Sequence, residues 1–324
     1  SLGDVLQEFR QHRQLMQQEL QKVIIGQHEV IEQLFAAIFT RGHCLLEGGP
    51  ALAKTLMIST LADSLSLAFS RIQFTPDLMP SDIMGSEILG EDRHFKFNPG
   101  PLFSNIVLAD EINRTPPKTQ AALLEAMQEK QVTIGNDPYL LDRPFLVLAT
   151  QNPVEQEGTY PLPEAQLDRF MMKVYVDYLT KPEELEVMRR MADLNFDYKV
   201  RATMSKEEIF AIRNEVNKVN ISDTLERYII ELVFATRRPM DYNLRDEARY
   251  IQFGVSPRAT IYLNLAAKAL AYLEGRDYVL PEDIKELAPD IMNHRILLNY
   301  EAEADGVRTS TIIDSILRKV AIGG

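Results

Sequence analysis

Residues 48–55, which read Gly-Gly-Pro-Ala-Leu-Ala-Lys-Thr, have the residue types of a phosphate-binding loop. In such a loop, consecutive backbone N–H groups at the start of a helix converge on phosphate oxygens. A lysine adds positive charge near the β- and γ-phosphates, and the next Ser or Thr hydroxyl holds Mg²⁺. Gly48, Lys54 and Thr55 stand at the required offsets, but Ala53 replaces the glycine that precedes the lysine. By itself the stretch fits either a nucleotide loop or an ordinary tight turn before an apolar helix.

Two adjacent acids follow an apolar run in NIVLADEINR, residues 105–114. If this run is a strand beside the loop, Asp110 can hold Mg²⁺ through water, and Glu111 can polarise an attacking water. A strand followed by a charged turn is the simpler alternative. Two acids at the end of a buried strand are less common in a chain that also carries the loop, so the pair favours a nucleotide site.

Three further polar residues each fit a role in nucleotide chemistry and a simpler structural role. The apolar run FLVLATQNP, residues 145–153, ends with Asn152, whose amide could orient water near a γ-phosphate; an Asn-Pro turn is the alternative. Arg169 precedes a final apolar run, where it is either a solvated cap partner or an arginine finger that reaches a neighbouring subunit's nucleotide. Arg258 begins a helix, where a cation is electrostatically misplaced, which indicates an anion nearby.

The elements that must position these residues alternate between apolar strands and helices. Near-continuous apolar strands predict a parallel sheet covered on both faces. We expect strands at 43–47, 69–74, 105–110, 144–151 and 171–176, helices at 54–66 and 117–130, and two helices within the first 41 residues. Two insertions, 85–103 and 131–142, have the alternation of β-hairpins and should project as loops.

After about residue 178 the pattern becomes helical, and each helix opens with Ser, Asp or Pro near its first turn. No strand-like alternation remains. We therefore predict an α/β domain over 1–179 and an all-helical domain over 180–324.

Composition limits the possible partners and compartments. The 324 residues carry a net charge of −12, which argues against a broad nucleic-acid surface. No apolar run approaches the roughly 20 residues that span a bilayer, so no membrane insertion is expected. The single cysteine, Cys44, excludes an internal disulfide framework and fits a reducing, cytoplasmic compartment; inside an apolar run it is most simply a small core residue. The five histidines show no metal-ligand spacing.

The motifs LADEINR, ATQNPVEQEGTYPLPEAQLDRF and SPRA, in this order after the loop, resemble the MoxR family of AAA+ ATPases. The similarity covers nearly the whole chain, including PPKTQAALLEAMQE. It implies a three-layer P-loop core with a helical lid, ATP and Mg²⁺ as cofactors, and assembly into a homo-oligomeric ring, expected as a hexamer. It also implies chaperone-like maturation of a protein client with a von Willebrand factor A domain, and it places the 85–103 hairpin toward the ring pore.

The resemblance also assigns roles residue by residue. Asp110 and Glu111 match Walker B, with Asp110 and Thr55 on the metal, Asn152 matches sensor 1, Arg169 the arginine finger and Arg258 sensor 2. Residues 23–27 would line the adenine side. The implied cofactor-binding residues are Ile24, Ile25, Gly48, Gly49, Pro50, Ala51, Leu52, Ala53, Lys54, Thr55 and Leu56.

The loop departs from the family pattern G-x-P-G-x-G-K-T at Ala51 and Ala53. If Ala51 must be left-handed, the alanine costs about 1–2 kcal/mol, and the Ala53 methyl would crowd the β-phosphate. A loss of around 3 kcal/mol would weaken binding about a hundredfold. Besides an active remodelling ATPase, two alternatives stay open: a nucleotide-compromised interaction module and a chelatase-like motor subunit. A DNA-acting motor is disfavoured by the net charge.

Overall fold

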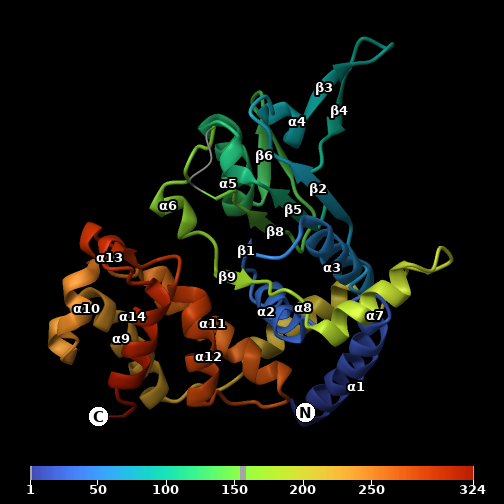
Figure 1. Cartoon of the computed structure of the whole chain (residues 1–324). Helices are drawn as coiled ribbons and strands as arrows, with labels where there is room; N and C mark the ends of the chain where they lie inside the picture. The colour runs from blue at the N-terminus through green and yellow to red at the C-terminus, as the bar shows by residue number, and fades with distance from the viewer. Residues whose placement is uncertain (1, 154–157, 324) are drawn as a thin grey trace.

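The computed structural model describes residues 2–153 and 158–323. Its centre is a five-stranded parallel sheet, in the order β2-β5-β8-β1-β9 (Figure 1). The strands are β1 Cys44–Glu47, β2 Phe69–Gln73, β5 Ile106–Asp110, β8 Leu146–Thr150 and β9 Met172–Tyr175. All five expected strands are thus confirmed. Because they are parallel, all begin at one edge of the sheet, the amino edge, and end at the other, the carboxyl edge.

Successive side chains of the central strands enter two separate cores, because a strand alternates its faces every residue. On β5, Ile106 and Leu108 belong to one buried cluster, and Val107 and Ala109 belong to the other. Cys44 is fully buried in the first cluster, as expected for a small core residue. Helices therefore cover both faces, and the three-layer α/β arrangement is confirmed.

Four helices of this layered part lie where they were expected, and the short helices α4 and α6 were not predicted. The helices are α1 Leu2–Gln21, α2 His28–Ile38, α3 Ala51–Ser64, α4 Pro80–Met84, α5 Pro117–Glu129 and α6 Glu164–Leu167. The largest difference is α3, which begins three residues earlier than the expected 54. That shift changes the geometry of the candidate phosphate loop.

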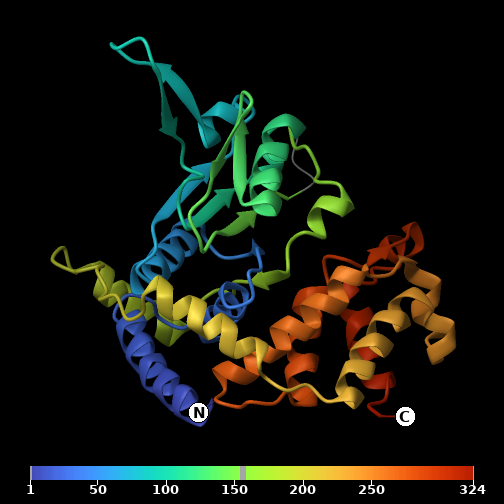
Figure 2. The ribbon, with the colours of Figure 1, turned by 180° about the vertical axis from the view of Figure 1, so that it is seen from behind.

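Both insertions form antiparallel hairpins, as predicted. One pairs β3 Gly85–Leu89 with β4 Phe95–Pro99, and the other pairs β6 Gln131–Ile134 with β7 Asp137–Leu140. The β3–β4 hairpin extends away from the body of the molecule in both views (Figures 1 and 2). It exposes the large apolar side chains of Ile88, Leu89 and Phe95.

The second half of the chain is mainly helical, as expected. Its helices are α7 Lys181–Met191, α8 Lys206–Asn217, α9 Asp223–Arg237, α10 Arg245–Tyr250, α11 Pro257–Leu273, α12 Pro281–Met292, α13 Tyr300–Ala304 and α14 Thr309–Lys319. Thr180, Ser205 and Ser222 cap α7, α8 and α9 by accepting backbone hydrogen bonds. The prediction that no strand remains was wrong in one detail, since β10 Ile251–Phe253 pairs with β11 Leu297–Leu298. These pieces of three and two residues are too short for alternation to reveal them.

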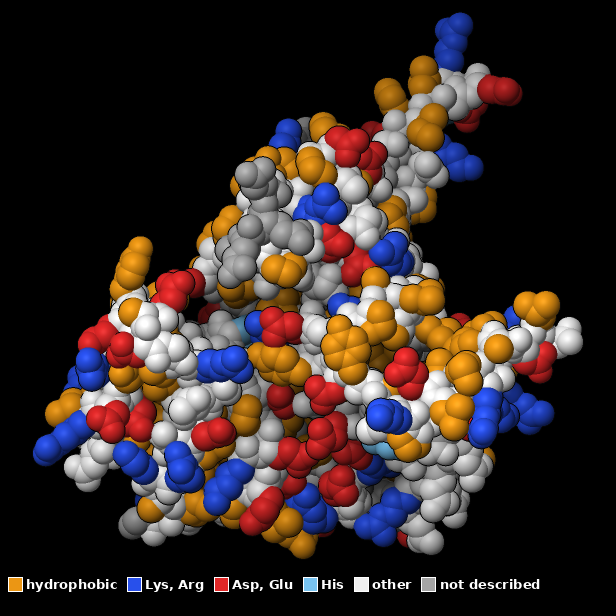
Figure 3. Space-filling view, in the orientation of Figure 1, with side chains coloured by type: hydrophobic (Ala, Val, Ile, Leu, Met, Phe, Trp, Pro, Cys, Tyr) orange, Lys and Arg blue, Asp and Glu red, His pale blue; other side chains and the backbone are white. Residues whose placement is uncertain are grey.

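Helices α7 and α8 lie beside α1 in both views, against the layered part (Figures 1 and 2). The segment before α8 donates a backbone hydrogen bond from Thr203 to the Ser64 carbonyl at the end of α3. Arg213 of α8 donates to the Ile38 carbonyl at the end of α2. The domain boundary near residue 180 stays a prediction. Acidic side chains gather between α2 and α12 on the face seen in Figure 3.

Candidate active site

The turn after β1 depends on two glycines. Gly48 and Gly49 have φ angles of +83° and +70°, which side chains other than glycine rarely adopt. A Cβ on Gly48 would lie 2.7 Å from the carbonyl oxygen of Val176, just after β9. The turn is therefore packed against the end of the neighbouring strand at the carboxyl edge, where ligands of parallel α/β sheets bind.

The next residues form a helical turn. Ala51 begins α3 in a right-handed conformation, so the left-handed cost considered for it does not arise. The backbone N–H of Lys54 donates to the Pro50 carbonyl at 3.2 Å, and the Thr55 hydroxyl donates to the Ala51 carbonyl at 3.0 Å. The N–H groups of residues 51–53 precede this first intrahelical bond and remain available to an anion.

Asp110 ends β5 and is almost fully buried. The Thr150 hydroxyl, at the end of β8, donates to its Oδ1 at 2.8 Å. Arg71 of β2 donates from Nε to Oδ2 at 2.9 Å, and its Nη2 lies 2.7 Å from the same oxygen. Both carboxylate oxygens of Asp110 therefore have partners within the chain.

Glu111 and Asn152 meet because β5 and β8 are neighbours in register. The Asn152 amide donates from Nδ2 to Oε2 of Glu111 at 2.8 Å. Arg114 lies 3.2 Å from the same oxygen. Asn113 fixes the backbone of residue 152 by two hydrogen bonds of 2.8 Å, one in each direction. The amide thus holds the carboxylate in one orientation at the carboxyl edge.

Residues 23–27 lie beside the same turn. Val23 and Ile24 are buried, and Ile25 is half-buried. The Gln27 side chain donates to the Asp177 carbonyl at 3.0 Å, next to Val176. This places the segment next to the glycine turn, where the adenine side was expected.

Arg169 and Arg258 lie elsewhere, at the amino edge. Both line a cavity of about 320 Å³ whose wall includes His43. His43 immediately precedes β1, and Arg169 lies three residues before β9. Lys54 and Asp110 instead stand where strands end. Strands of four or five residues, at about 3.3 Å each, separate the two edges by roughly 13–16 Å. The two arginines therefore face away from the loop of their own chain.

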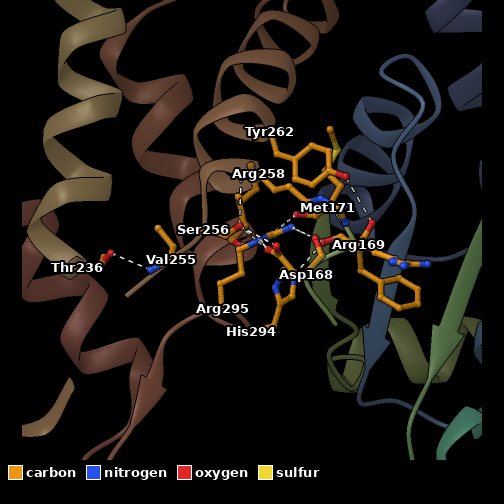
Figure 4. A network of polar contacts seen from close by, with 12 residues as sticks. Asp168, Arg169, Met171, Thr236, Val255, Ser256, Arg258, Tyr262, His294 and Arg295 are labelled. Atoms are coloured by element: carbon orange, nitrogen blue, oxygen red, sulfur yellow. Dashed lines mark hydrogen bonds and ion pairs between the residues drawn. The ribbon is translucent and has the colours of Figure 1, made fainter. Parts of the chain in front are cut away.

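The Asp168 cluster (Asp168, Ser256 and Arg295) brings the two arginines together (Figure 4). The Ser256 hydroxyl lies 2.8 Å from both carboxylate oxygens of Asp168, and Arg295 donates from Nε to Oδ1 at 2.8 Å. Asp168 precedes Arg169 directly, and Ser256 caps the helix that carries Arg258. The cluster thus joins the layered part to the helical part at the cavity.

Two family models match the chain. That of the ATPase family associated with various cellular activities (AAA) matches residues 43–172, and that of the AAA lid domain matches residues 244–316. Chaperone MoxR1 of Mycobacterium tuberculosis is 42% identical over 94% of this chain and 80% of its own length. This chain belongs to the MoxR family of AAA+ ATPases.

Other relatives agree. The protein YeaC of Bacillus subtilis is 44% identical over 94% of this chain and 93% of its own length. The crystal structure at 2.00 Å of a candidate ATPase from Cytophaga hutchinsonii is 59% identical to this chain. It superposes with a TM-score of 0.94 and covers 99% of this chain and 98% of its own. The MoxR resemblance and the AAA+ core with a helical lid are confirmed.

The carboxyl edge of this MoxR-family protein has the residue types that a magnesium nucleotide needs. It offers free helical N–H groups, the Lys54 ammonium, the Thr55 hydroxyl and the carboxylates of Asp110 and Glu111. Within residues 2–153 and 158–323, no group of three or more His, Cys, Asp or Glu side chains could hold a metal ion. A magnesium site would thus need the nucleotide's own oxygens as further ligands. No helix in the described residues has the length and apolarity needed to cross a bilayer.

Sequence reasoning missed two residues of this MoxR-family ATPase. Arg71 lies in the middle of β2, opposite Leu108 of β5, and its contact with Asp110 depends on the order of the strands in the sheet. Arg295 lies 127 residues from Asp168, and nothing in the sequence around it pointed to that contact.

Proposed function

We propose that this MoxR-type ATPase binds Mg–ATP at residues 48–56 and hydrolyses it in a homo-oligomeric ring to remodel or mature a protein client. One observation carries the proposal: the loop and acids occupy the carboxyl edge, while Arg169 and Arg258 line a cavity at the amino edge. In a head-to-tail ring, the amino edge of one subunit meets the carboxyl edge of the next. Each nucleotide site would then be completed by the two arginines of a neighbour.

Within this site, the residues divide the work. The Lys54 ammonium and the N–H groups of residues 51–53 bind the phosphates, and the Thr55 hydroxyl binds the metal. Glu111 accepts a hydrogen bond from the attacking water and draws off its proton, while Asn152 keeps the carboxylate oriented. Bound Mg–ATP supplies the phosphoryl group that is transferred. Arg169 of the neighbouring subunit stabilises the charge that develops on it.

Two inactive variants can test the shared site. Lys54→Ala removes the loop lysine, and Arg169→Ala removes the finger. Each alone should hydrolyse little ATP, but an equimolar mixture should regain activity, because about a quarter of random head-to-tail interfaces join an intact loop to an intact finger. The matched control mixes Lys54→Ala with Glu111→Gln, which both change the carboxyl edge. Activity would need an intact loop and an intact acid in the same subunit. No subunit of this mixture has both, so no activity should return. Recovery in neither mixture contradicts sharing between subunits.

A second candidate is the nucleotide-compromised module, favoured by the hydrogen bond between the Lys54 N–H and the Pro50 carbonyl. Alanine favours a helical turn over glycine by about 0.5–1 kcal/mol per residue, so Ala51 and Ala53 stabilise the turn that closes this bond. Calorimetric titration with Mg–ATP separates the candidates. Micromolar binding rejects the compromised module, and no binding at millimolar ATP supports it.

The client contact that we propose is the β3–β4 hairpin, which exposes Ile88, Leu89 and Phe95 far from the site. The name of one relative, Chaperone MoxR1, supports a client-directed role. A client with a von Willebrand factor A domain, a hexameric ring, a pore-facing hairpin, a chelatase-like role and the reducing cytoplasm stay predictions. Co-purification with wild-type protein, and its loss in a Leu89→Ser/Phe95→Ser variant, would identify the client and the surface that binds it.

A further inference from the structure

A second cavity, of about 420 Å³, adjoins the one that holds Arg169 and Arg258, and the two share Arg41 and Lys130. It lies between the end of α2, the end of α5, the start of β8 and the face of α8. Its charged and aromatic lining residues are Arg41, Lys130, Arg143, Phe145, Phe210 and Arg213. No carboxylate lines it among the described residues.

Four cations line this cavity, and the two half-buried ones, Lys130 and Arg213, contrast with two other half-buried arginines of the molecule. Arg295 is paired with Asp168, and Arg276 with Asp283. Within residues 2–153 and 158–323, no ion pair joins any of the four to an acid. In a chain with 47 acidic and 35 basic residues, acids were available. Four like charges around one cavity are unfavourable unless an anion enters it.

Lys130 lies against a histidine ring and not against an acid. The Val147 N–H donates to Nδ1 of His43 at 2.9 Å, so the proton of the neutral ring is on Nε2. That N–H points to the Met127 carbonyl at 3.3 Å, and the Lys130 amine lies 2.9 Å from the same Nε2. An ammonium there would set a donor against a donor, whereas a neutral amine accepts. Burial, followed by the three arginines of the cavity, lowers the pKa of Lys130 to about 8.

Two of the four cations lie at the solvent-exposed rim of the cavity, where an anion can reach them. Arg41 and Arg143 are exposed at its rim, while Lys130 and Arg213 are half-buried inside it. Guanidinium groups donate paired hydrogen bonds that match the oxygens of a phosphate group. The volume lies in the usual range for small-ligand sites. Phe210 adds a partly exposed ring to the wall.

We propose that this cavity binds a small anion that carries two or more phosphate groups. It is separate from the phosphate loop, because it lies at the amino edge and its walls include α8 and the start of β8. The proposal therefore does not depend on ATP hydrolysis at residues 48–56. A polyphosphate chain and the phosphates of a nucleotide share this chemistry. The other conceivable occupant, an acidic surface of a second subunit, is an outcome of the test.

The experiment uses the full chain carrying Lys54→Ala, so that the phosphate loop does not compete. Titration calorimetry with sodium tripolyphosphate at low ionic strength should show one binding site. Arg41→Ala/Arg143→Ala should weaken binding about tenfold or more for each arginine removed. The matched control, Arg93→Ala/Arg189→Ala, removes two exposed arginines elsewhere and should bind as before. No binding at millimolar tripolyphosphate, or equal losses in both variants, overturns the proposal.

Proton linkage tests the position of the anion. A bound polyanion raises the pKa of Lys130, so at pH 8 binding should take up more protons than in a Lys130→Arg variant, which still binds. Heats measured in two buffers of different ionisation enthalpy give this difference. It should shrink at pH 6.5, where the Lys130 amine is already protonated. An uptake that Lys130→Arg leaves unchanged means that the anion binds elsewhere.

Two further arms identify the source of the anion. ATP that binds more tightly than tripolyphosphate, with the preference lost in Phe210→Ala, indicates a nucleotide. Equal binding indicates that the phosphate chain alone is recognised. Light scattering on the same variants addresses the second subunit: if Arg41→Ala/Arg143→Ala abolishes assembly and tripolyphosphate binds neither protein, the cavity is a subunit interface and the proposal is wrong.

Discussion

The two edges of the central sheet carry complementary chemistry. At the carboxyl edge, the two acids already have partners: Arg71 and Thr150 on Asp110, and Asn152 and Arg114 on Glu111. At the amino edge, cations line two adjoining cavities, and no acidic side chain lines either of them among the described residues. The carboxyl edge can orient a metal and a water, and the two cavities of the amino edge are lined by cations with no acid among their described lining residues.

This difference between the two edges explains why the molecule should work as an assembly. Neither edge can reach the other within one chain, because the length of the strands lies between them. A head-to-tail arrangement brings opposite edges of two copies together, and it repeats the same contact around a ring. Variants that change one edge at a time test this arrangement.

The largest effect is expected at the amino edge. Arg169→Ala should lower the hydrolysis rate by about 10³-fold or more, as for other arginine fingers. Binding of ATP should change much less than turnover, because Arg169 of the neighbour acts mainly on the charge that develops during phosphoryl transfer. Steady-state turnover and equilibrium nucleotide binding, measured on the assembled protein, check both statements. Normal turnover in an assembled Arg169→Ala ring would remove the finger assignment.

At the carboxyl edge, Glu111→Gln should lower turnover by roughly 10²–10⁴-fold while ATP binding persists. The amide keeps the size of the side chain and can still contact Asn152, but it cannot take a proton from water. Single-turnover hydrolysis with bound nucleotide measures the step directly. If Glu111→Gln hydrolyses ATP at the normal rate, Glu111 is not the residue that activates water.

Most of the carboxyl edge could be predicted from the sequence, because its residues end or follow apolar runs. Asp110, Glu111 and Asn152 each stand at a strand end, and parallel strands bring their ends together. The glycine turn could be predicted in the same way, because Gly48 and Gly49 directly follow the apolar run of β1. What the sequence hid at this edge was Arg71, which lies in the middle of a strand and reaches Asp110 only through the order of the sheet.

The amino edge was less predictable, since its residues meet through tertiary contacts. Arg169 and Arg258 were identified singly, but their shared cavity depends on the packing of α11 and α12 against the segment before β9. Lys130 directly follows α5 and Arg213 lies on α8, and no spacing connects them. The start of α3 was misplaced for a local reason: Ala51 and Ala53 extend the helix toward Pro50, where glycines would end it.

The Asp168 cluster should have an intermediate effect, and on a different quantity. Asp168→Ala leaves the nearly buried Arg295 guanidinium without its carboxylate, which should lower the free energy of unfolding by about 3–5 kcal/mol. It should also loosen the link between the layered and helical parts. Denaturant titration measures the first effect. The matched control, Asp314→Ala on an exposed helix face, should change stability by less than about 0.5 kcal/mol; equal losses would deny the cluster a special role.

The smallest effect concerns the loop itself. Ala53→Gly should strengthen Mg–ATP binding about two- to fivefold, because glycine weakens the helical turn that holds the Lys54 N–H on the Pro50 carbonyl by about 0.5–1 kcal/mol. This explanation differs from crowding by the Ala53 methyl, and a second variant separates them. Ala51→Gly loosens the same turn without removing that methyl, so it should strengthen binding by a similar factor if the helical turn is the cause. Calorimetric titration of both variants decides: a gain in Ala53→Gly alone points to crowding, and no gain in either shows that the alanines do not limit nucleotide binding at this edge.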